Sequence, residues 1–109
     1  MINKVYIIHY TKLVDRKKHM IQQMNHWFPN VEYEFIEDFD QEDLNEKIIN
    51  QNFDLDAFKN KFDRDFLLSE MSLCMKYKTA ISKASKDDKE NIFILEDDVI
   101  FKESPINYF

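Results

Sequence analysis

Apolar and polar positions alternate along this chain with two different periods, and each change of period marks an expected element. Residues 2–8 (INKVYII) form a short, β-branched apolar run that predicts a buried strand. From about Leu13 to Trp27 apolar side chains recur at helical spacing, which predicts a helix that ends before Pro29. Residues 31–37 (VEYEFIE) alternate apolar and acidic side chains and predict a strand that is exposed on one face. The first third of the chain therefore predicts a β-α-β unit.

The second half of the chain predicts a long helix followed by a further strand. Residues 38–65 are acidic and polar with two short helical patterns, so we expect a variable connection there. A clear helical period then runs from Asp65, a suitable N-cap residue, to about Ser85. Residues 92–96 (IFILE) are apolar in the manner of a central parallel strand. The expected apolar face of the long helix consists of Leu67, Leu68, Met71, Cys74, Met75 and Ile81.

This alternation of strands and helices predicts an α/β fold, with a mostly parallel sheet flanked by helices. In open sheets of that kind, ligands bind at the carboxyl ends of the strands. The first expected strand leads into His9, Tyr10 and Thr11, and the last leads into a run of three carboxylates at 96–98. Both groups are therefore candidate site residues.

The composition narrows the class of protein. The chain has 109 residues with 44% hydrophobic content, which suffices for the core of one small domain, and its net charge of -6 argues against nucleic-acid binding. The absence of glycine excludes glycine-rich phosphate loops. A single cysteine, Cys74, is expected to be a small core residue in a reducing compartment. Apolar runs are too short for a transmembrane segment or a signal peptide, so we expect a cytoplasmic protein.

The three consecutive carboxylates Glu96, Asp97 and Asp98 pose a physical problem, because adjacent negative charges repel one another beside a buried strand. On an extended backbone Glu96 and Asp98 share a face, while Asp97 points away from it. Mg²⁺ and Mn²⁺ bind one or two carboxylates and complete their coordination with water and substrate phosphate. The sequence leaves two interpretations open: a metal site that receives a nucleotide diphosphate, or an acidic turn that ends the strand at the surface.

Three blocks of the chain together resemble glycosyltransferase family 25, the lipooligosaccharide and collagen β-galactosyltransferase group with a GT-A type, Rossmann-like fold. KVYIIHYTKLVDRKKHM resembles the opening strand and turn of the family, SEMSLCMKYKTAI resembles its G-E-I-G-C-x-L-S-H helix, and FILEDDVIF resembles its acidic block. The resemblance covers roughly residues 3–28 and 68–102. Ser69 and Ser72 stand where the family usually has glycine, and Tyr77 falls near its histidine.

The resemblance implies a transferase for lipopolysaccharide biosynthesis that moves a hexose, such as galactose or glucose, from a UDP-sugar to a hydroxyl of a glycan, lipooligosaccharide or protein. It implies Mn²⁺ or Mg²⁺ held by Glu96 and Asp98. The donor would be contacted by His9, Tyr10, Thr11, Arg16, Glu70 and Asp97. From the residues alone, Arg16 is equally an ordinary surface helix residue, Glu70 a first-turn carboxylate favoured by the helix dipole, and His9 a structural histidine.

The length of the chain bears on how much of such an enzyme it contains. A GT-A catalytic domain is longer than 109 residues. We therefore expect residues 1–109 to be a single domain, the N-terminal donor-binding part of a truncated glycosyltransferase, and we assign no catalytic base. Two alternatives stay open: a non-catalytic nucleotide-sugar-binding or interaction module, and a small α/β domain whose acidic turn binds no ligand.

Overall fold

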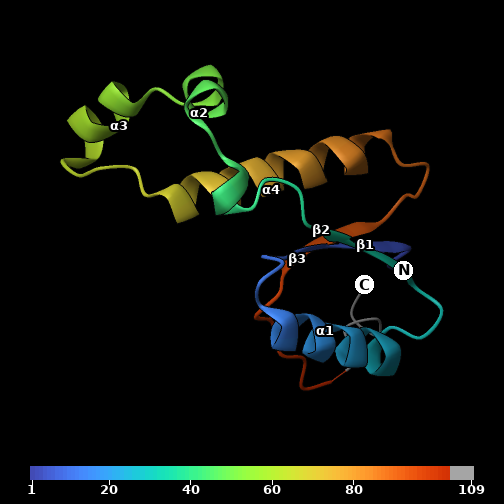
Figure 1. Ribbon diagram of the computed structural model, residues 1–109. Coiled ribbons are helices and arrows are strands. Elements are labelled where there is room, and N and C mark those ends of the chain that lie inside the picture. The colour runs from blue at the N-terminus through green and yellow to red at the C-terminus, as the bar shows by residue number, and fades with distance from the viewer. Residues whose placement is uncertain (104–109) are drawn as a thin grey trace.

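The computed structural model describes residues 1–103, which form a parallel three-stranded sheet with helices on both faces (Figure 1). The elements that build it are β1 (Lys4–Ile8), α1 (Val14–Trp27), β2 (Glu32–Ile36), α4 (Leu68–Lys86) and β3 (Ile92–Glu96). The strands are ordered β2-β1-β3, with α1 on one face of the sheet and α4 on the other (Figure 1). The α/β fold and the parallel sheet predicted from the sequence are therefore confirmed.

The strand β1 is buried along its whole length because it has a paired strand on each side. Its side chains alternate between the two faces of the sheet. Val5 and Ile7 pack on the α1 side, whereas Tyr6 and Ile8 pack on the α4 side. The register also places Ile8 beside Glu96, so that the ends of β1 and β3 meet at one edge. The core on the α1 side is completed by Ile2, Met20, Met24 and Phe28.

The strand β3 lies at the edge of the described sheet, and the prediction that it is central is wrong. Among residues 1–103 it pairs only with β1, and all five of its side chains are half-buried. Phe93 and Leu95 pack on the α1 side, while Ile92 and Ile94 pack on the α4 side. The strand is apolar on both faces because a helix covers each face of the sheet, and this coverage does not require a paired strand on each side.

The N-terminal end of α4 differs from the prediction. Its N-cap residue is Leu67, not Asp65, which instead forms an exposed ion pair of 3.4 Å with Lys59. The backbone N–H of Leu67 donates to the carboxylate of Glu70 over 3.1 Å. A carboxylate at the third helical position therefore satisfies the free backbone donor that we expected Asp65 to cap.

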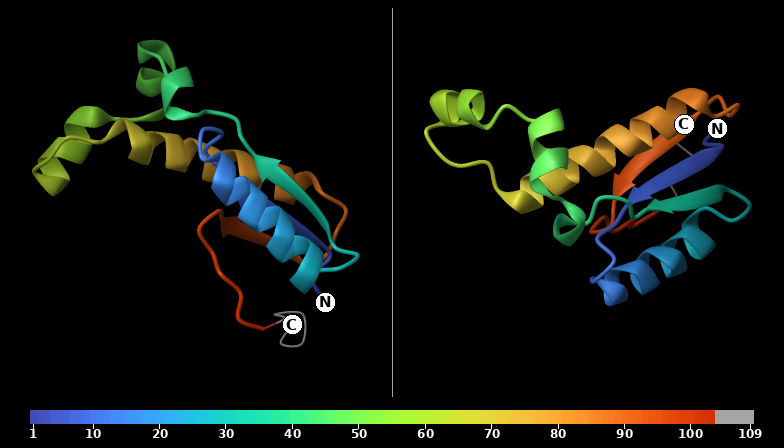
Figure 2. Two further views of the ribbon diagram at one scale, coloured as in Figure 1. Left: turned by 60° about the horizontal axis from the view of Figure 1, so that its bottom comes forward. Right: turned by 45° about the horizontal axis from the view of Figure 1, so that its top comes forward.

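The buried face of α4 also differs from the expected apolar face. Met71 and Met75 are buried as predicted, but Ser72, Lys76 and Ala80 complete the buried row. The N-terminal half of α4 extends beyond the sheet (Figures 1 and 2), so apolar side chains there have no sheet to cover them. The expected core residues that are exposed instead are Leu67, Leu68 and Cys74 at this end of α4 and Ile81 in its C-terminal half.

The acidic connection contains a 3-10 turn, η1 (Gln41–Asp43), and two short helices, α2 (Glu46–Asn52) and α3 (Leu55–Phe62). The side chains of Asn45 and Asp54 accept backbone N–H bonds at the starts of these helices. Phe58 stacks on Phe66 with ring centroids 4.1 Å apart, which gives the connection a small aromatic cluster of its own. Both helices stand away from the sheet, beside the N-terminal half of α4 (Figure 2).

The longest described helix, α4, has 19 residues and carries several lysines and serines among its apolar side chains. Within residues 1–103, no helix combines the length and the apolar character needed to cross a membrane. The cytoplasmic location stays a prediction from the sequence.

Candidate functional site

A cavity of ≈ 190 Å³ opens where the carboxyl ends of β1 and β3 meet the first turns of α4. Its lining brings together four of the residues selected from the sequence, namely Tyr10, Arg16, Glu96 and Asp97. Small-molecule pockets commonly have volumes of roughly 300–1,000 Å³, so this cavity can enclose only part of a sugar nucleotide. The cavity lies at the carboxyl ends of the strands, and the polar segments that follow β1 and β3 meet there, as the sequence predicted.

Asp97 is the buried centre of the acidic run. Its Oδ2 atom lies 2.8 Å from Nδ1 of His9, and its Oδ1 atom accepts a hydrogen bond of 3.3 Å from Nη1 of Arg16. Asp97 is 7% exposed, whereas the Arg16 side chain is 51% exposed. A positive charge does stand beside the acidic run, as electrostatics demands, and at Asp97 the protein itself supplies it.

His9 lies beneath this ion pair and does not line the cavity. It is 1% exposed, its backbone N–H donates to the carbonyl of Ile36, and its ring meets Phe35 edge to face. Its Nε2 atom is buried without a hydrogen-bond partner among residues 1–103. Because an ionised carboxylate only accepts, Nδ1 is the nitrogen that carries the hydrogen when it bonds Asp97. The structure therefore places His9 as a support for Asp97.

Glu96 and Asp98 differ from Asp97 in having no cationic partner among residues 1–103. Glu96 is half-buried and lines the cavity, and Asp98 is exposed. Burial raises the pKa of the Tyr77 hydroxyl, and its hydrogen bond to Glu96 and the charges of Glu96 and Asp98 raise it further. Glu96 ends the strand and the chain turns at 97–98, so Asp97 also lines the cavity. The prediction that Asp97 points away from the face of Glu96, which rested on strand alternation, is therefore wrong.

The donor set at Glu96 and Asp98 can be compared with the chemistry of the expected metal. Within residues 1–103, no group of three or more His, Cys, Asp or Glu side chains is arranged to hold a metal ion. Mg²⁺ and Mn²⁺ that bind together with a diphosphate need only one or two protein carboxylates. Glu96 lines the cavity, Asp98 is an exposed carboxylate two residues later, and neither has a cationic partner among residues 1–103, which fits that requirement. The metal stays a prediction.

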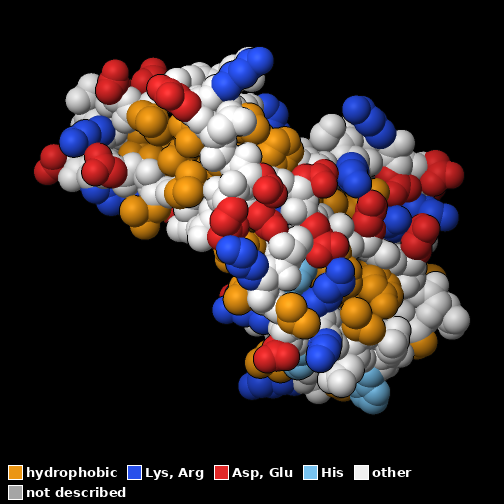
Figure 3. Space-filling view, viewed as in Figure 1, with side chains coloured by type: hydrophobic (Ala, Val, Ile, Leu, Met, Phe, Trp, Pro, Cys, Tyr) orange, Lys and Arg blue, Asp and Glu red, His pale blue; other side chains and the backbone are white. Residues whose placement is uncertain are grey.

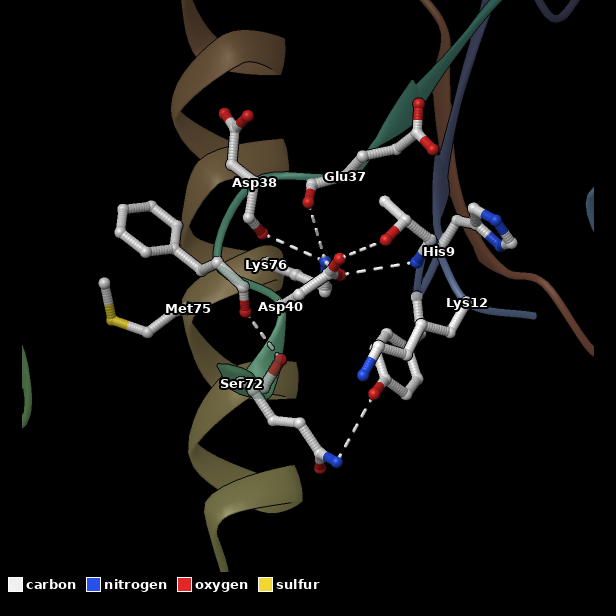
Figure 4. A network of polar contacts seen from close by, with 12 residues as sticks. His9, Lys12, Glu37, Asp38, Asp40, Ser72, Met75 and Lys76 are labelled. Carbon is white, nitrogen blue, oxygen red and sulfur yellow. Dashed lines mark hydrogen bonds and ion pairs between the residues drawn. The ribbon is translucent and has the colours of Figure 1, made fainter. Parts of the chain in front are cut away.

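A buried ion pair between Lys76 and Asp40 joins three segments around the cavity (Figure 4). Lys76 is 3% exposed, and its Nζ atom donates to Asp40 over 2.7 Å and to the carbonyls of Glu37 and Asp38 over 3.1 and 3.0 Å. Thr11 donates its hydroxyl to the other carboxylate oxygen of Asp40. Burial would raise the pKa of Asp40, but the hydrogen bonds from Lys76 and Thr11 outweigh this and lower it.

This arrangement determines what Lys76 and Thr11 can do. All three ammonium hydrogens of Lys76 are used by protein oxygens, so Lys76 positions the loop after β2 and does not present a free donor to an anion. Thr11 likewise ties the loop after β1 to Asp40 and does not line the cavity. The sequence did not single out Lys76 or Asp40, and it marked Ser72 only as a departure from the family's glycine. The spacing of Ser72, Lys76 and Ala80 by four residues, which places a lysine in a buried helical row, was the available signal.

The remaining polar residues of the site are fixed in two further ways. Tyr10 lines the cavity and donates its hydroxyl to Glu42, which also pairs with Lys12 at 3.1 Å. Gln23 of α1 binds the segment that follows the acidic run, because its amide donates to the carbonyl of Val99 over 2.6 Å and accepts from the N–H of Phe101 over 2.7 Å. The acidic run is thus held on both sides.

Glu70 does not line the cavity. Its carboxylate receives two hydrogen bonds from Arg64, of 2.7 and 2.9 Å, in addition to the backbone N–H of Leu67. The Arg64 guanidinium is the main reason that the pKa of Glu70 falls to about 2. These contacts account for Glu70 as a helix-capping residue, and donor contact by Glu70 stays a prediction.

Comparison with known proteins gives one match. A family model described as glycosyltransferase family 25 (LPS biosynthesis protein) matches residues 2–107. No curated protein and no solved structure matches the chain. The matched range includes every described strand and helix, and with them the cavity and the acidic run.

Proposed function

The chain belongs to glycosyltransferase family 25, and from this premise we propose that the cavity at the ends of β1 and β3 binds the diphosphate of a UDP-hexose. The hexose, galactose or glucose, is transferred to a hydroxyl of a glycan acceptor of lipopolysaccharide biosynthesis. One observation carries the proposal: the half-exposed guanidinium of Arg16 and the carboxylate of Glu96 line one cavity at the carboxyl end of β3, where α/β proteins bind nucleotides, and the exposed Asp98 follows in the same turn.

In this proposal Arg16 is the residue that contacts the donor phosphate. Its guanidinium is anchored on one side by Asp97 and exposed on the other, so it can accept a second anionic partner. Asp97 and His9 act through Arg16 and are positioning residues. Tyr10, which lines the same cavity, is placed to contact the donor beside Arg16.

Glu96 and Asp98 are the proposed ligands of Mn²⁺ or Mg²⁺. When bound, the metal would neutralise negative charge on the departing nucleoside diphosphate. The protein contributes the two carboxylates, the anchored guanidinium and the fixed position of the strand ends. Catalysis of this transfer then depends on positioning and electrostatic stabilisation. We assign no catalytic base among residues 1–103.

The small volume of the cavity supports a second candidate function, a nucleotide-sugar-binding module without transferase activity. A cavity of ≈ 190 Å³ has room for a part of the size of the diphosphate but not for a whole sugar nucleotide. Both candidates require the same phosphate and metal site. They differ in whether hexose is released from the donor to an acceptor.

Calorimetric titration of the protein with UDP, with and without Mn²⁺, tests the shared site. We expect binding that requires Mn²⁺, that is lost in Asp98→Asn and weakened in Arg16→Gln. The matched control is Asp56→Asn. It removes one exposed carboxylate from α3, a helix that contributes no residue to the lining of the cavity. Binding that is independent of metal and unchanged in Asp98→Asn contradicts the metal assignment. A transfer assay with UDP-galactose and UDP-glucose on lipopolysaccharide then separates an enzyme from a binding module.

A further inference from the structure

A second and larger cavity, of ≈ 620 Å³, lies between α2 and α4 on the other side of the loop that follows β2. Phe39 of the loop lines its wall. Ile48 and Gln51 of α2 and Met75, Thr79 and Ser82 of α4 line it as well. Hydrophobic side chains gather over α2, α3 and the neighbouring end of α4, next to this cavity (Figure 3). The volume falls within the range of roughly 300–1,000 Å³ that is typical of small-ligand pockets.

Phe39 is held in a backbone conformation that is unfavourable for its residue type. Its φ of 64° lies in the left-handed region. The two other positive-φ positions among residues 1–103 are Asn30 and Asp63, both of residue types that tolerate this region. A bulky aromatic residue does not, and such strain persists only where the surrounding structure imposes it. A simple turn would not require a phenylalanine, so the position of its ring needs another explanation.

The surrounding structure does impose this conformation. Ser72 donates its hydroxyl to the Phe39 carbonyl over 2.6 Å, and Lys76 holds the two preceding carbonyls (Figure 4). Phe39 and Met75 both line the cavity. Buried polar groups of α4 thus fix an aromatic wall of the cavity at the cost of local backbone strain.

The remaining lining offers polar groups and positive charge. The side-chain amide of Gln51 and the hydroxyl of Ser82 are at exposed residues and have no protein hydrogen-bond partner among residues 1–103. Lys78 donates to Asn52 over 3.2 Å and has no carboxylate partner in that part of the chain. Lys83, the second lysine of the wall, is paired with Glu34 of β2 at 2.9 Å. No carboxylate lines the wall, and Lys78 is its cation without a carboxylate partner among residues 1–103, although the chain as a whole has a net charge of -6.

We propose that this cavity binds an anionic saccharide unit of the glycan acceptor, at a distance from the hydroxyl that reacts. An aromatic ring covers the apolar face of a sugar, a free amide and a free hydroxyl bind its hydroxyl groups, and the ammonium group of Lys78 attracts a phosphate or carboxylate substituent. The inference rests on the proposed transferase function, since it names the acceptor of that reaction. Binding of a remote part of the acceptor helps to orient the reacting hydroxyl.

The two cavities share the residues that shape them. Gln41 lines the donor cavity and Phe39, two residues earlier, lines the saccharide cavity. Ser72 and Lys76 line the donor cavity, and they also hold the backbone that presents Phe39. A donor site and an acceptor subsite therefore lie on opposite sides of one loop that α4 holds rigidly.

The test is a two-dimensional NMR titration of the protein with core oligosaccharide of lipopolysaccharide, freed of lipid A and with its phosphates intact. We expect the amide signals of Gln51, Asn52, Thr79 and Ser82 to shift. Phe39→Ala should weaken binding by about five- to tenfold, whereas Phe39→Tyr, which keeps the ring, should retain it. Gln51→Ala and Lys78→Gln, at exposed positions of α2 and α4, provide variants whose folding is not at risk, and each should also weaken binding.

The same oligosaccharide after enzymatic removal of its phosphates is the matched ligand control, and it should bind more weakly. No binding, shifts confined to Tyr10 and Arg16, or equal binding by Gln51→Ala and Lys78→Gln would overturn the proposal. Shifts of the cavity signals with protein concentration alone would identify a second copy of the chain as the occupant and overturn it as well. The UDP titration is measured separately, so loss of oligosaccharide binding with UDP binding intact rejects the saccharide cavity alone.

Discussion

Nδ1 of the buried His9 lies 2.8 Å from Oδ2 of Asp97, a residue 88 positions away in the chain. This contact joins the end of β1 to the end of β3 and, through the other oxygen of Asp97, orients Arg16 of α1. Three adjacent carboxylates in the sequence thus take different roles. Asp97 is paired inside the protein, whereas Glu96 and Asp98 have no cationic partner among residues 1–103.

The first prediction compares two neighbouring carboxylates. Asp97→Asn should lower the free energy of unfolding by about 1–3 kcal/mol, because buried partners lose a charged acceptor. Asp98→Asn removes the same charge at an exposed position and should change the free energy of unfolding by no more than about 0.5 kcal/mol. Urea denaturation of both variants measures the difference. Equal effects would show that the contacts of Asp97 with His9 and Arg16 add no stability.

The second prediction concerns the buried pair of Lys76 and Asp40. Lys76→Met should lower the free energy of unfolding by about 3–5 kcal/mol, because it leaves the carboxylate of Asp40 buried without its cation. Lys59→Met breaks an exposed pair with Asp65 and should cost about 0–1 kcal/mol. Urea denaturation again provides the measurement. A small loss in Lys76→Met would mean that water reaches Asp40 in the folded protein.

The third prediction is a pH dependence at Glu70. Its pKa falls from an ordinary 4.5 to about 2 in the folded protein, chiefly through Arg64. A lowered folded-state pKa contributes stability that is fully present above about pH 4.5 and is lost as the pH falls towards 2. Glu70→Gln keeps an oxygen that can accept the Leu67 N–H but removes the charge.

Thermal unfolding tests this pH dependence. The wild-type protein and Glu70→Gln are compared between about pH 6 and about pH 3, a range that brackets the ordinary pKa of 4.5. The wild-type protein should unfold at a higher temperature at the upper end of the range, and the difference should narrow as the pH falls. A difference that stays constant across the range would indicate that Glu70 acts by packing or capping and that its charge adds nothing.

The fourth prediction follows from the exposed position of Cys74 on α4. A water-soluble thiol reagent should modify Cys74 in the native protein at a rate similar to that in denaturant, because no unfolding is needed for access. Absorbance of the released thiolate measures both rates. If Cys74 is modified only when urea unfolds the protein, its side chain is buried, as the sequence predicted.

Local periodicity in the sequence was enough to predict the elements of this fold. The strand at 2–8, the helix from Leu13 and the strand at 31–37 are confirmed, and the two short helical patterns of the acidic connection correspond to α2 and α3. The position of the acidic run at the end of a strand was also predicted. These features depend on neighbouring residues, whose side-chain period the sequence states directly.

Tertiary structure decided which strand is central, which carboxylate is neutralised and which face of α4 is buried. The apolar run of β3 is compatible with an edge or a central position, because helices can cover both faces of either. The partners of Asp97 and Lys76 lie 88 and 36 positions away, and no local pattern specifies such pairs. The sequence by itself determined the elements and the chemistry that ends them; only the packing of α1 and α4 on the sheet determined which charges meet, because that depends on contacts between distant segments.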